Sequence, residues 1–210
     1  MPVPVVFRKN ERFNKNYDFV SALTGMGVQV LHLSTTTQNS GGGRIILSQA
    51  TESSGISSNS GQPTGSFTKL QDYDHDAVVN TNFTLDGIAT FNFTVSALGG
   101  GADTVDGYLI IKIRKWDGTT ETEVASVQTT ERSSGAGAQT YFREQVEATI
   151  TKTAYTPGDT LRITVEVWAK DDGSSGSNQF IFYHDPANRT QVDTDNKSTA
   201  FTGYLPVVIQ

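Results

Sequence analysis

Strict alternation of apolar and polar residues is the feature of this sequence that most constrains its fold. In "ATFNFTVSA", residues 89–97, Phe91, Phe93 and Val95 alternate with threonine, asparagine and serine. Successive side chains of a β-strand point to opposite faces, so this period of two predicts a strand with one face in a core and the other toward water. "LRITVEVWA", residues 161–169, repeats the pattern.

The rest of the chain also indicates strands separated by turns. The Asp117-Gly118 pair is favoured in tight hairpins and predicts that the strands on either side are antiparallel neighbours. Pro206 predicts an edge strand or a break, because proline cannot donate a hydrogen bond to a sheet. Only residues 16–27 suggest a short helix. The further predicted strands are 28–34, 44–49, 108–116, 122–129, 142–152, 179–183 and 204–210. The sequence therefore predicts an all-β fold, an antiparallel β-sandwich of jelly-roll type.

The first third of the chain differs from the rest in amino-acid composition. We assign residues 1–65 to an N-terminal arm and Ser/Gly-rich loops with short strands, and residues 66–210 to the β-sandwich domain. The opening "PVPVVF" carries Val3, Val5 and Phe7, which predict an extended arm. Such an arm can pair with another chain or with the edge of its own sheet, and both alternatives stay open.

Composition excludes several kinds of protein. The chain has no cysteine, so disulfides, thiolate zinc sites and cysteine nucleophiles are ruled out. With a net charge of −6 and one small cationic cluster at residues 113–116, no nucleic-acid partner is expected. No apolar run approaches the roughly 20 residues that span a bilayer, so no membrane partner is expected either. The N-terminus does not have the pattern of a signal peptide, which predicts that the chain is made in the host cytoplasm and is used there or released by lysis.

The histidines do not predict a catalytic site. His184 lies beside Asp185, but neighbouring residues on an extended chain point to opposite sides, so Asp185 cannot easily orient His184 as a base. Asp185 followed by Pro186 is instead typical of a turn at the end of a strand. His32, His75 and His184 lie far apart and lack the spacing of a zinc site. The sequence thus predicts no catalytic residue.

Acidic residues alternate in "DYDHDAVVN", residues 72–80. Asp72, Asp74 and Asp76 are the ligand type that Ca²⁺ prefers, but the stretch lacks the glycine turn and the distal glutamate of a calcium loop. A solvated acidic loop is the favoured interpretation. We therefore predict no metal site and no cofactor.

The two tryptophans are the candidate contacts of the predicted sandwich domain. Trp116 ends a strand beside the hairpin turn, and Trp168 lies on the side of its strand opposite the core residues. Exposed tryptophan stacks on sugar rings or anchors protein contacts. The alternative is that a neighbouring loop covers each ring. With Val3, Val5 and Phe7, these two residues are the predicted partner contacts.

Four segments in order carry a resemblance to a known group of proteins: "GYLIIKIRKWDGTTETEVASVQT", "YTPGDTLRITVEVWA", "FYHDPANR" and "YLPVVIQ". Over about residues 83–210 the chain resembles β-sandwich virion proteins of tailed phages and related environmental viruses, above all capsid decoration (cement) proteins. The resemblance implies no enzymatic activity and no cofactor. It also implies a homo-oligomer, with a trimer favoured, that binds the major capsid protein or other virion proteins on the capsid surface.

From the sequence we therefore expect a structural virion protein, a decoration protein that stabilises the capsid shell through repeated surface contacts. A carbohydrate-binding sandwich for host attachment, with a glycan as partner, is an alternative. A tail, neck or fibre component of the virion is another. A hydrolase is a third alternative.

Overall fold

A computed structural model describes residues 26–37, 45–48, 57–59, 63, 65–173, 178–183 and 201–209. The arm residues Val3, Val5 and Phe7, most of the helix candidate at 16–27, and His184 with Asp185 lie outside the described residues. Within the described residues all regular structure is strand, which confirms the predicted all-β fold.

The described residues form twelve strands. They are β1 (Met26–Thr37), β2 (Ile45–Ser48), β3 (Ser57–Asn59), β4 (Thr68–Val78), β5 (Phe83–Leu98), β6 (Val105–Trp116), β7 (Glu121–Gln128), β8 (Arg132–Ser133), β9 (Gln139–Tyr155), β10 (Thr160–Asp171), β11 (Gln179–Tyr183) and β12 (Thr202–Ile209).

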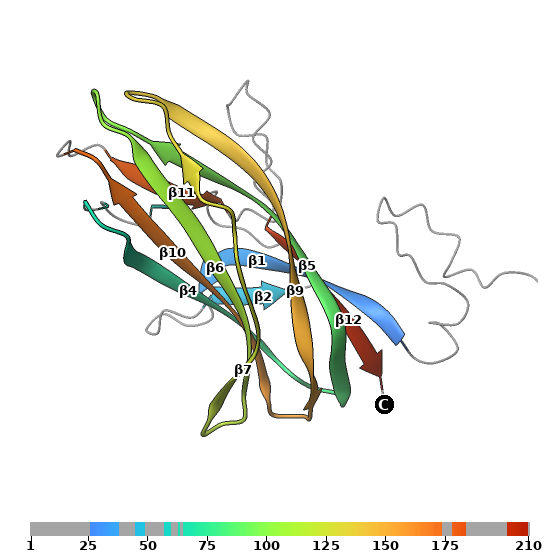
Figure 1. The fold of residues 1–210 in the computed structure, drawn as a ribbon. Coiled ribbons are helices and arrows are strands. Elements are labelled where there is room, and N and C mark those ends of the chain that lie inside the picture. Colours follow the sequence, from blue (N-terminus) through green and yellow to red (C-terminus); the bar gives the residue numbers. More distant parts are fainter. Residues whose placement is uncertain are drawn as a thin grey trace, which may run out of the picture.

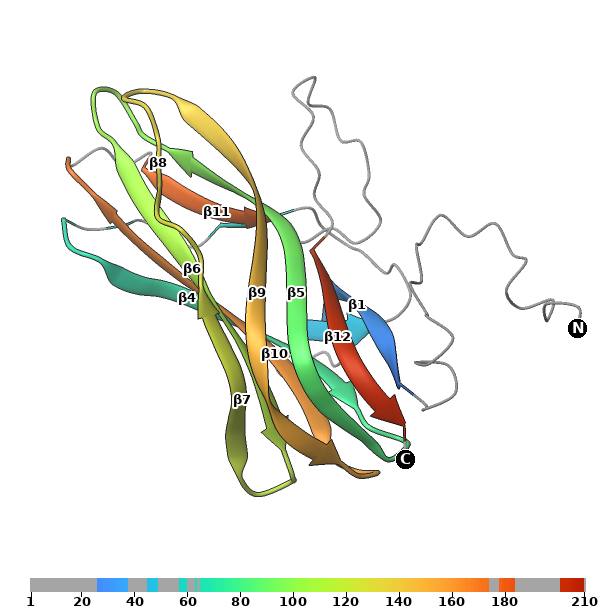
Figure 2. The same ribbon diagram turned by 45° about the vertical axis from the view of Figure 1, so that its right-hand side comes forward.

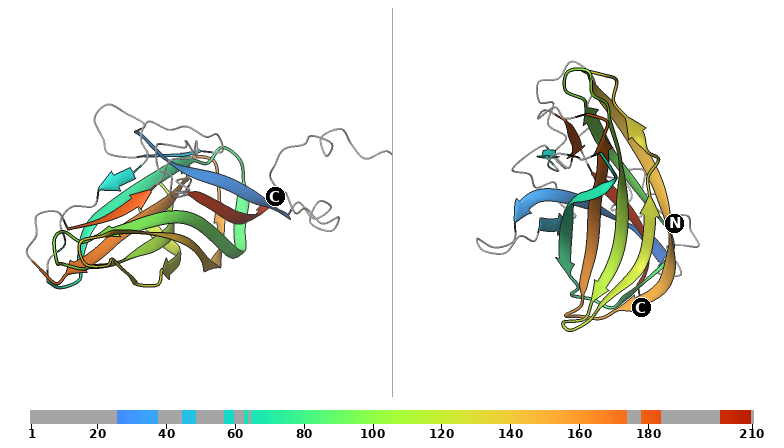
Figure 3. Two further views of the ribbon diagram at one scale, coloured as in Figure 1. Left: turned by 90° about the horizontal axis from the view of Figure 1, so that it is seen from above. Right: turned by 60° about the vertical axis from the view of Figure 1, so that its left-hand side comes forward.

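The strands form two layers that pack as a sandwich, as predicted (Figures 1 and 2). One layer places β5 at its centre, paired with β9 and with β11 and β12, and β1 continues it beside β12. The other layer has the order β4-β10-β6-β7. The first half of β1 pairs with β12, and its second half pairs with β2. Because β2 in turn pairs with β4, backbone hydrogen bonds continue from one layer to the other (Figure 3). Strand pairing is antiparallel except between β2 and β4.

The core lies between the layers, where the alternation in the sequence placed it. Phe91, Phe93 and Val95 of β5 are buried, and so are Ile163 and Val165 of β10. Close packing of the layers depends on a glycine in β6, because a Cβ atom at position 107 would overlap the ring of Phe180. The aromatic rings of Phe91, Phe93 and Phe182 each contact the ring of Phe201 in the same core.

The turn predictions hold. β6 and β7 are antiparallel neighbours, Gly118 has φ +97°, and Asp117 Oδ1 accepts hydrogen bonds from the Thr119 and Thr120 amides at 2.9 and 2.7 Å. The break predicted at Pro206 is also found: β12 lies between β1 and β5, and its register with β5 shifts between Tyr204 and Val207.

The predicted acidic loop at residues 72–80 is wrong for most of its length, because residues 68–78 form β4. Tyr73, His75 and Ala77 alternate with the aspartates and lie opposite Val165, Ile163 and Leu161 of β10. The inward residues include a histidine and a tyrosine, so the stretch did not have the usual apolar signature of a strand. β1 and β2 come from the part of the chain assigned to the arm and loops, yet they pair with β12 and β4. The boundary between residues 65 and 66 stays a prediction.

Candidate functional site

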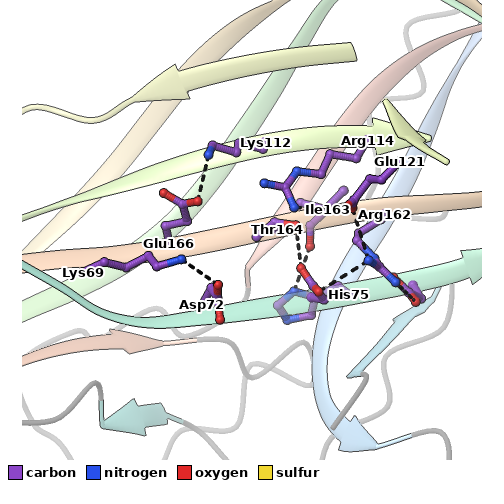
Figure 4. A network of polar contacts seen from close by, with 12 residues as sticks. Lys69, Asp72, His75, Lys112, Arg114, Glu121, Arg162, Ile163, Thr164 and Glu166 are labelled. Carbon is purple, nitrogen blue, oxygen red and sulfur yellow. Dashed lines mark hydrogen bonds and ion pairs between the residues drawn. The ribbon is translucent and has the colours of Figure 1, made fainter. Parts of the chain in front are cut away.

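Polar side chains gather on the outer side of the sheet β4-β10-β6-β7, facing away from the core (Figure 4). β10 is the central strand of this group, with Arg162 directly opposite Asp76 of β4 and Arg114 of β6, and with Thr164 opposite Asp74 and Lys112. We call this surface the charged face. Its members are Asp72, Asp74, Asp76, Lys112, Arg114, Glu121, Arg162, Thr164 and Glu166.

Arg162 is the hub of the charged face. Its Nε and Nη2 atoms donate to the two carboxylate oxygens of Asp76 at 2.7 and 2.9 Å, a bidentate pair. Its Nη1 atom also lies 3.2 Å from Glu121 Oε1 and 3.6 Å from Asp74 Oδ2. The hydrogen bonds that Arg162 donates to Asp76, more than its contacts with any other neighbour, raise the pKa of Arg162 above its ordinary value. Arg114 lies 3.4 Å from the same Glu121 oxygen and extends the network to β6.

A second set of contacts continues along β10. Thr164 Oγ1 donates to Asp74 Oδ1 at 2.6 Å. Glu166 accepts from Lys112 Nζ at 2.8 Å and from the Trp168 ring N–H at 3.1 Å. Burial alone would raise the pKa of Glu166, but the hydrogen bonds from Lys112 and Trp168 outweigh it and leave the pKa lowered. Glu166 is therefore ionised at neutral pH.

The outward residues of β10 are buried although they lie outside the core. Arg162 is 6% exposed, Thr164 1% and Glu166 6%, on a strand that is flanked on both sides by β4 and β6. Buried charges are stable only when they are paired and hydrogen-bonded, and here each has a partner. The charged face is thus a fixed arrangement of paired charges rather than a set of mobile surface side chains.

An aromatic group lies at one end of the charged face. The Tyr108 ring of β6 stacks on Trp168 of β10, with ring centroids 6.2 Å apart and an angle of 7° between the planes. The Tyr108 ring also contacts Phe67, with ring centroids 5.1 Å apart. Lys170 Nζ lies 4.6 Å from the Phe67 ring centroid. Each of these three rings is partly exposed.

The two tryptophans are on the same side of this sheet. Trp168 lies opposite Tyr108, and Trp116 lies opposite Thr160 at the other end of β6 and β10. By strand alternation Trp116 shares the side of Lys112 and Arg114, and both tryptophans are partly buried. The structure therefore places Trp116 and Trp168 at opposite ends of the charged face. Their role as partner contacts stays a prediction.

The histidines lie elsewhere. His75 points into the core behind the charged face, where its Nδ1 atom lies 3.2 Å from the carbonyl oxygen of Ile163 (Figure 4). Complete burial lowers the pKa of His75 to about 4. His32 Nδ1 lies 3.3 Å from Thr202 Oγ1 in the other sheet, and burial lowers its pKa as well. In nucleophilic catalysis a hydroxyl is activated by a neighbouring imidazole, which is itself held by an orienting group. The contact between Thr202 and His32 supplies the first two of these groups, and two groups alone do not make a catalytic site.

Each aspartate of β4 makes an ion pair. Asp72 pairs with Lys69 at 2.9 Å, and Asp74 and Asp76 pair with Arg162. Asp74 also accepts the hydrogen bond from Thr164. In the described part of the chain no group of three or more His, Cys, Asp or Glu side chains is arranged to hold a metal ion. The same part contains no helix that could cross a membrane.

Sequence reasoning missed most of the charged face. Arg162 and Glu166 were interpreted as solvent-facing because they alternate with the core residues of "LRITVEVWA". The available signal was the alternation of aspartates with Tyr73 and His75, which is compatible with a strand. The pairing of this strand, β4, with β10 depends on contacts between residues nearly 90 positions apart in the sequence.

Comparison with known proteins finds solved structures with a similar fold, but it does not assign the chain to a family. No protein-family model matches the sequence, and no curated protein has significant similarity to it. Two crystal structures of a CocE/NonD family hydrolase from Staphylococcus aureus are similar, with TM-scores of 0.53 and 0.52 and identities of 15% and 14%. They cover 87% and 88% of this chain, and this chain spans 37% of the hydrolase in each. An α-amino acid ester hydrolase matches at a TM-score of 0.42, too low to support an argument.

These comparisons correct the function expected from the sequence. The two structures that match with TM-scores above 0.5 are of a CocE/NonD family hydrolase, which contradicts the interpretation as a structural virion protein and the prediction of no enzymatic activity. Where the structure describes them, the segments that carried the resemblance are strands and turns, which any protein with this sandwich needs. Because one fold serves many functions, such segments could not distinguish a virion protein from part of a hydrolase. At 15% identity the likeness shows the fold alone.

Proposed function

We propose that this chain is the β-sandwich module of a hydrolase, and that its charged face rests against the catalytic unit. The observation that carries the proposal is the burial of Arg162, Thr164 and Glu166 on the outer side of a sheet. A surface whose charges are already paired loses little side-chain freedom on binding, so it suits a lasting contact with another protein unit.

The composition of the charged face supports a protein partner. Tryptophan, tyrosine and arginine are the residues that most often dominate protein interfaces. Here Trp116 and the Trp168–Tyr108 stack lie at the two ends of the face, with Arg162 between them. The partly exposed aromatic rings supply apolar contact area, and the ion pairs fix the orientation of the partner.

The comparison with the hydrolases supports the choice of partner. This chain spans 37% of the CocE/NonD family hydrolase, so 63% of that protein (100 minus 37) has no counterpart here. We infer that the catalytic unit corresponds to the part of such a hydrolase that this chain does not span. It is carried by a separate polypeptide or by a longer form of this chain.

The experiment tags the sandwich at its native gene, purifies it from its own cells, and treats the preparation with a fluorophosphonate probe and with p-nitrophenyl acetate. We expect a labelled hydrolase to copurify and to hydrolyse the ester. Trp168→Ala and Lys112→Glu should reduce the copurifying activity at least tenfold, because interface hot spots contribute about 2 kcal/mol or more each. Ile88→Ala is the matched control, because Ile88 is 56% exposed on β5 in the other sheet.

Two results would refute the proposal. The first is a preparation with neither labelled protein nor ester turnover. The second is copurification that the variants of the charged face leave unchanged, or that Ile88→Ala reduces by as much. In a longer form of the chain, where the catalytic unit cannot dissociate, the same variants should lower the melting temperature of the catalytic unit.

A further inference from the structure

A cavity of about 360 Å³ lies between the two layers at one end of the sandwich. Gln29 and Leu31 of β1 and Val207 of β12 line it from one layer, and Ala77 of β4 and Leu161 of β10 line it from the other. The link 79–82 and Phe83 at the start of β5 complete the wall. No member of the charged face lines this cavity, so it is a separate feature of the molecule.

The cavity is deep and open at one side. A smaller space of about 50 Å³ shares Gln29, Phe83, Leu161 and Val207 with it and reaches Leu85 and Leu205, which are fully buried. The opposite end is formed by exposed residues, namely Val78, which is 60% exposed, and Asn80, Thr81 and Asn82. The space therefore runs from a polar mouth to an apolar floor in the core.

Protein interiors are normally packed without voids of this size. An apolar space of about 150 Å³ in a protein core already stays dry and takes up small apolar molecules. At roughly 30 Å³ per water-sized group, 360 Å³ has room for about a dozen non-hydrogen atoms. Its volume falls in the lower part of the range of about 300–1,000 Å³ that is typical of ligand pockets.

The lining defines the chemistry of a ligand. The floor and walls are aliphatic and aromatic, and none of the eleven lining residues that the structure describes carries a charge. The polar groups are amides and a hydroxyl: Asn80, Thr81 and Asn82 at the mouth, and Gln29 on the wall. Among the described residues the hydrogen bond of Gln29 Nε2 is a long one, 3.4 Å to the carbonyl oxygen of Val30.

We propose that this cavity binds a small neutral amphiphile, an aliphatic chain of about eight carbons that ends in an uncharged hydroxyl, ester or amide group. The aliphatic part of the ligand enters between Leu161 and Val207, and its polar end forms hydrogen bonds with the amides of the lining. A carboxylate or ammonium group would meet no opposite charge in the lining and would lose part of its hydration, so charged analogues bind more weakly.

The test is a titration of the full chain with 1-octanol, followed through the methyl NMR signals of leucine, isoleucine and valine. We expect saturable shifts of the Leu31, Leu161 and Val207 methyl signals. Sodium octanoate at pH 7 should bind at least tenfold more weakly. Ala77→Phe places a ring in the cavity and should weaken octanol binding at least tenfold, and Val207→Phe serves the same purpose if Ala77→Phe does not fold. The control, Ile88→Phe, adds a ring on the outer side of β5 and should bind octanol like the wild type.

The proposal is overturned if octanol causes no saturable shift, if octanoate binds as tightly, or if both filled variants bind like the wild type. It is also overturned if nuclear Overhauser contacts in the ligand-free chain join Val5 or Phe7 to the Leu161 methyl groups, because the first residues of the chain would then occupy the cavity. The result does not depend on the proposed hydrolase partner, since no partner is present in the titration.

Discussion

Removal of the Asp76 carboxylate should destabilise the protein strongly. Asp76 and Arg162 form a bidentate pair at 2.7 and 2.9 Å, and their side chains are only 3% and 8% exposed. Breaking a buried pair by deleting one partner costs about 3–5 kcal/mol, because the other charge stays buried without compensation. In Asp76→Ala the guanidinium keeps Glu121 at 3.2 Å and Asp74 at 3.6 Å, both more exposed, so we expect the lower limit of about 3 kcal/mol.

The assay is urea unfolding at pH 7, followed by tryptophan fluorescence and by circular dichroism. For a protein of this size, about 3 kcal/mol corresponds to a melting temperature roughly 6–12 °C lower. The denaturant dependence, or m-value, should not change, because the same surface is exposed on unfolding. Lys69→Met is the matched control: its ion pair with Asp72 is 41% and 52% exposed, and its loss should cost less than about 1 kcal/mol.

A double variant tests the reasoning itself. Asp76→Leu with Arg162→Met removes both charges and keeps side chains of similar size, so its stability should return to within about 1 kcal/mol of the wild type or exceed it. The argument is wrong if Asp76→Ala costs less than about 1 kcal/mol. It is also wrong if the double variant is as unstable as Asp76→Ala, because the loss would then come from packing rather than from an unpaired charge.

Two further predictions concern the core. The pKa of His75 is about 4 in the folded chain and ordinarily 6.5, so the unfolded chain takes up the proton first, and stability present above pH 6.5 is lost as the pH falls toward 4. Between pH 7.5 and 5 this loss amounts to about 2 kcal/mol, and urea unfolding of His75→Leu should show a pH dependence smaller by that amount; an unchanged dependence would contradict it. Gly107→Ala forces a methyl group into the Phe180 ring and should cost about 1–3 kcal/mol by thermal unfolding, whereas Gly65→Ala, with open space around it, should be neutral. Equal effects of the two glycine variants would show that the layers move apart without cost.

The strands rich in aliphatic residues could be recognised from the sequence because their side chains repeat every second position. β5 and β10 are examples: Phe91 and Ile163 point into the core as predicted. The β6–β7 hairpin followed from Asp117 and Gly118, since the turn needs a residue with positive φ and an acceptor for the turn amides. β4 was not recognised, because its inward positions include Tyr73 and His75.

The sequence by itself determined the class of fold, the positions of most strands and the core-facing side of the strands with clear alternation, since these depend on neighbours one to three residues apart. Only the tertiary structure decided which strands are neighbours. β10 lies between β4 and β6, and this arrangement joins Asp74, Asp76 and Glu121 in one network around the buried Arg162. The cavity has the same origin, because its walls come from strands of both layers and its volume depends on how the layers meet. Contacts between distant residues depend on how side chains of different strands fit together in three dimensions, and local patterns do not encode that fit.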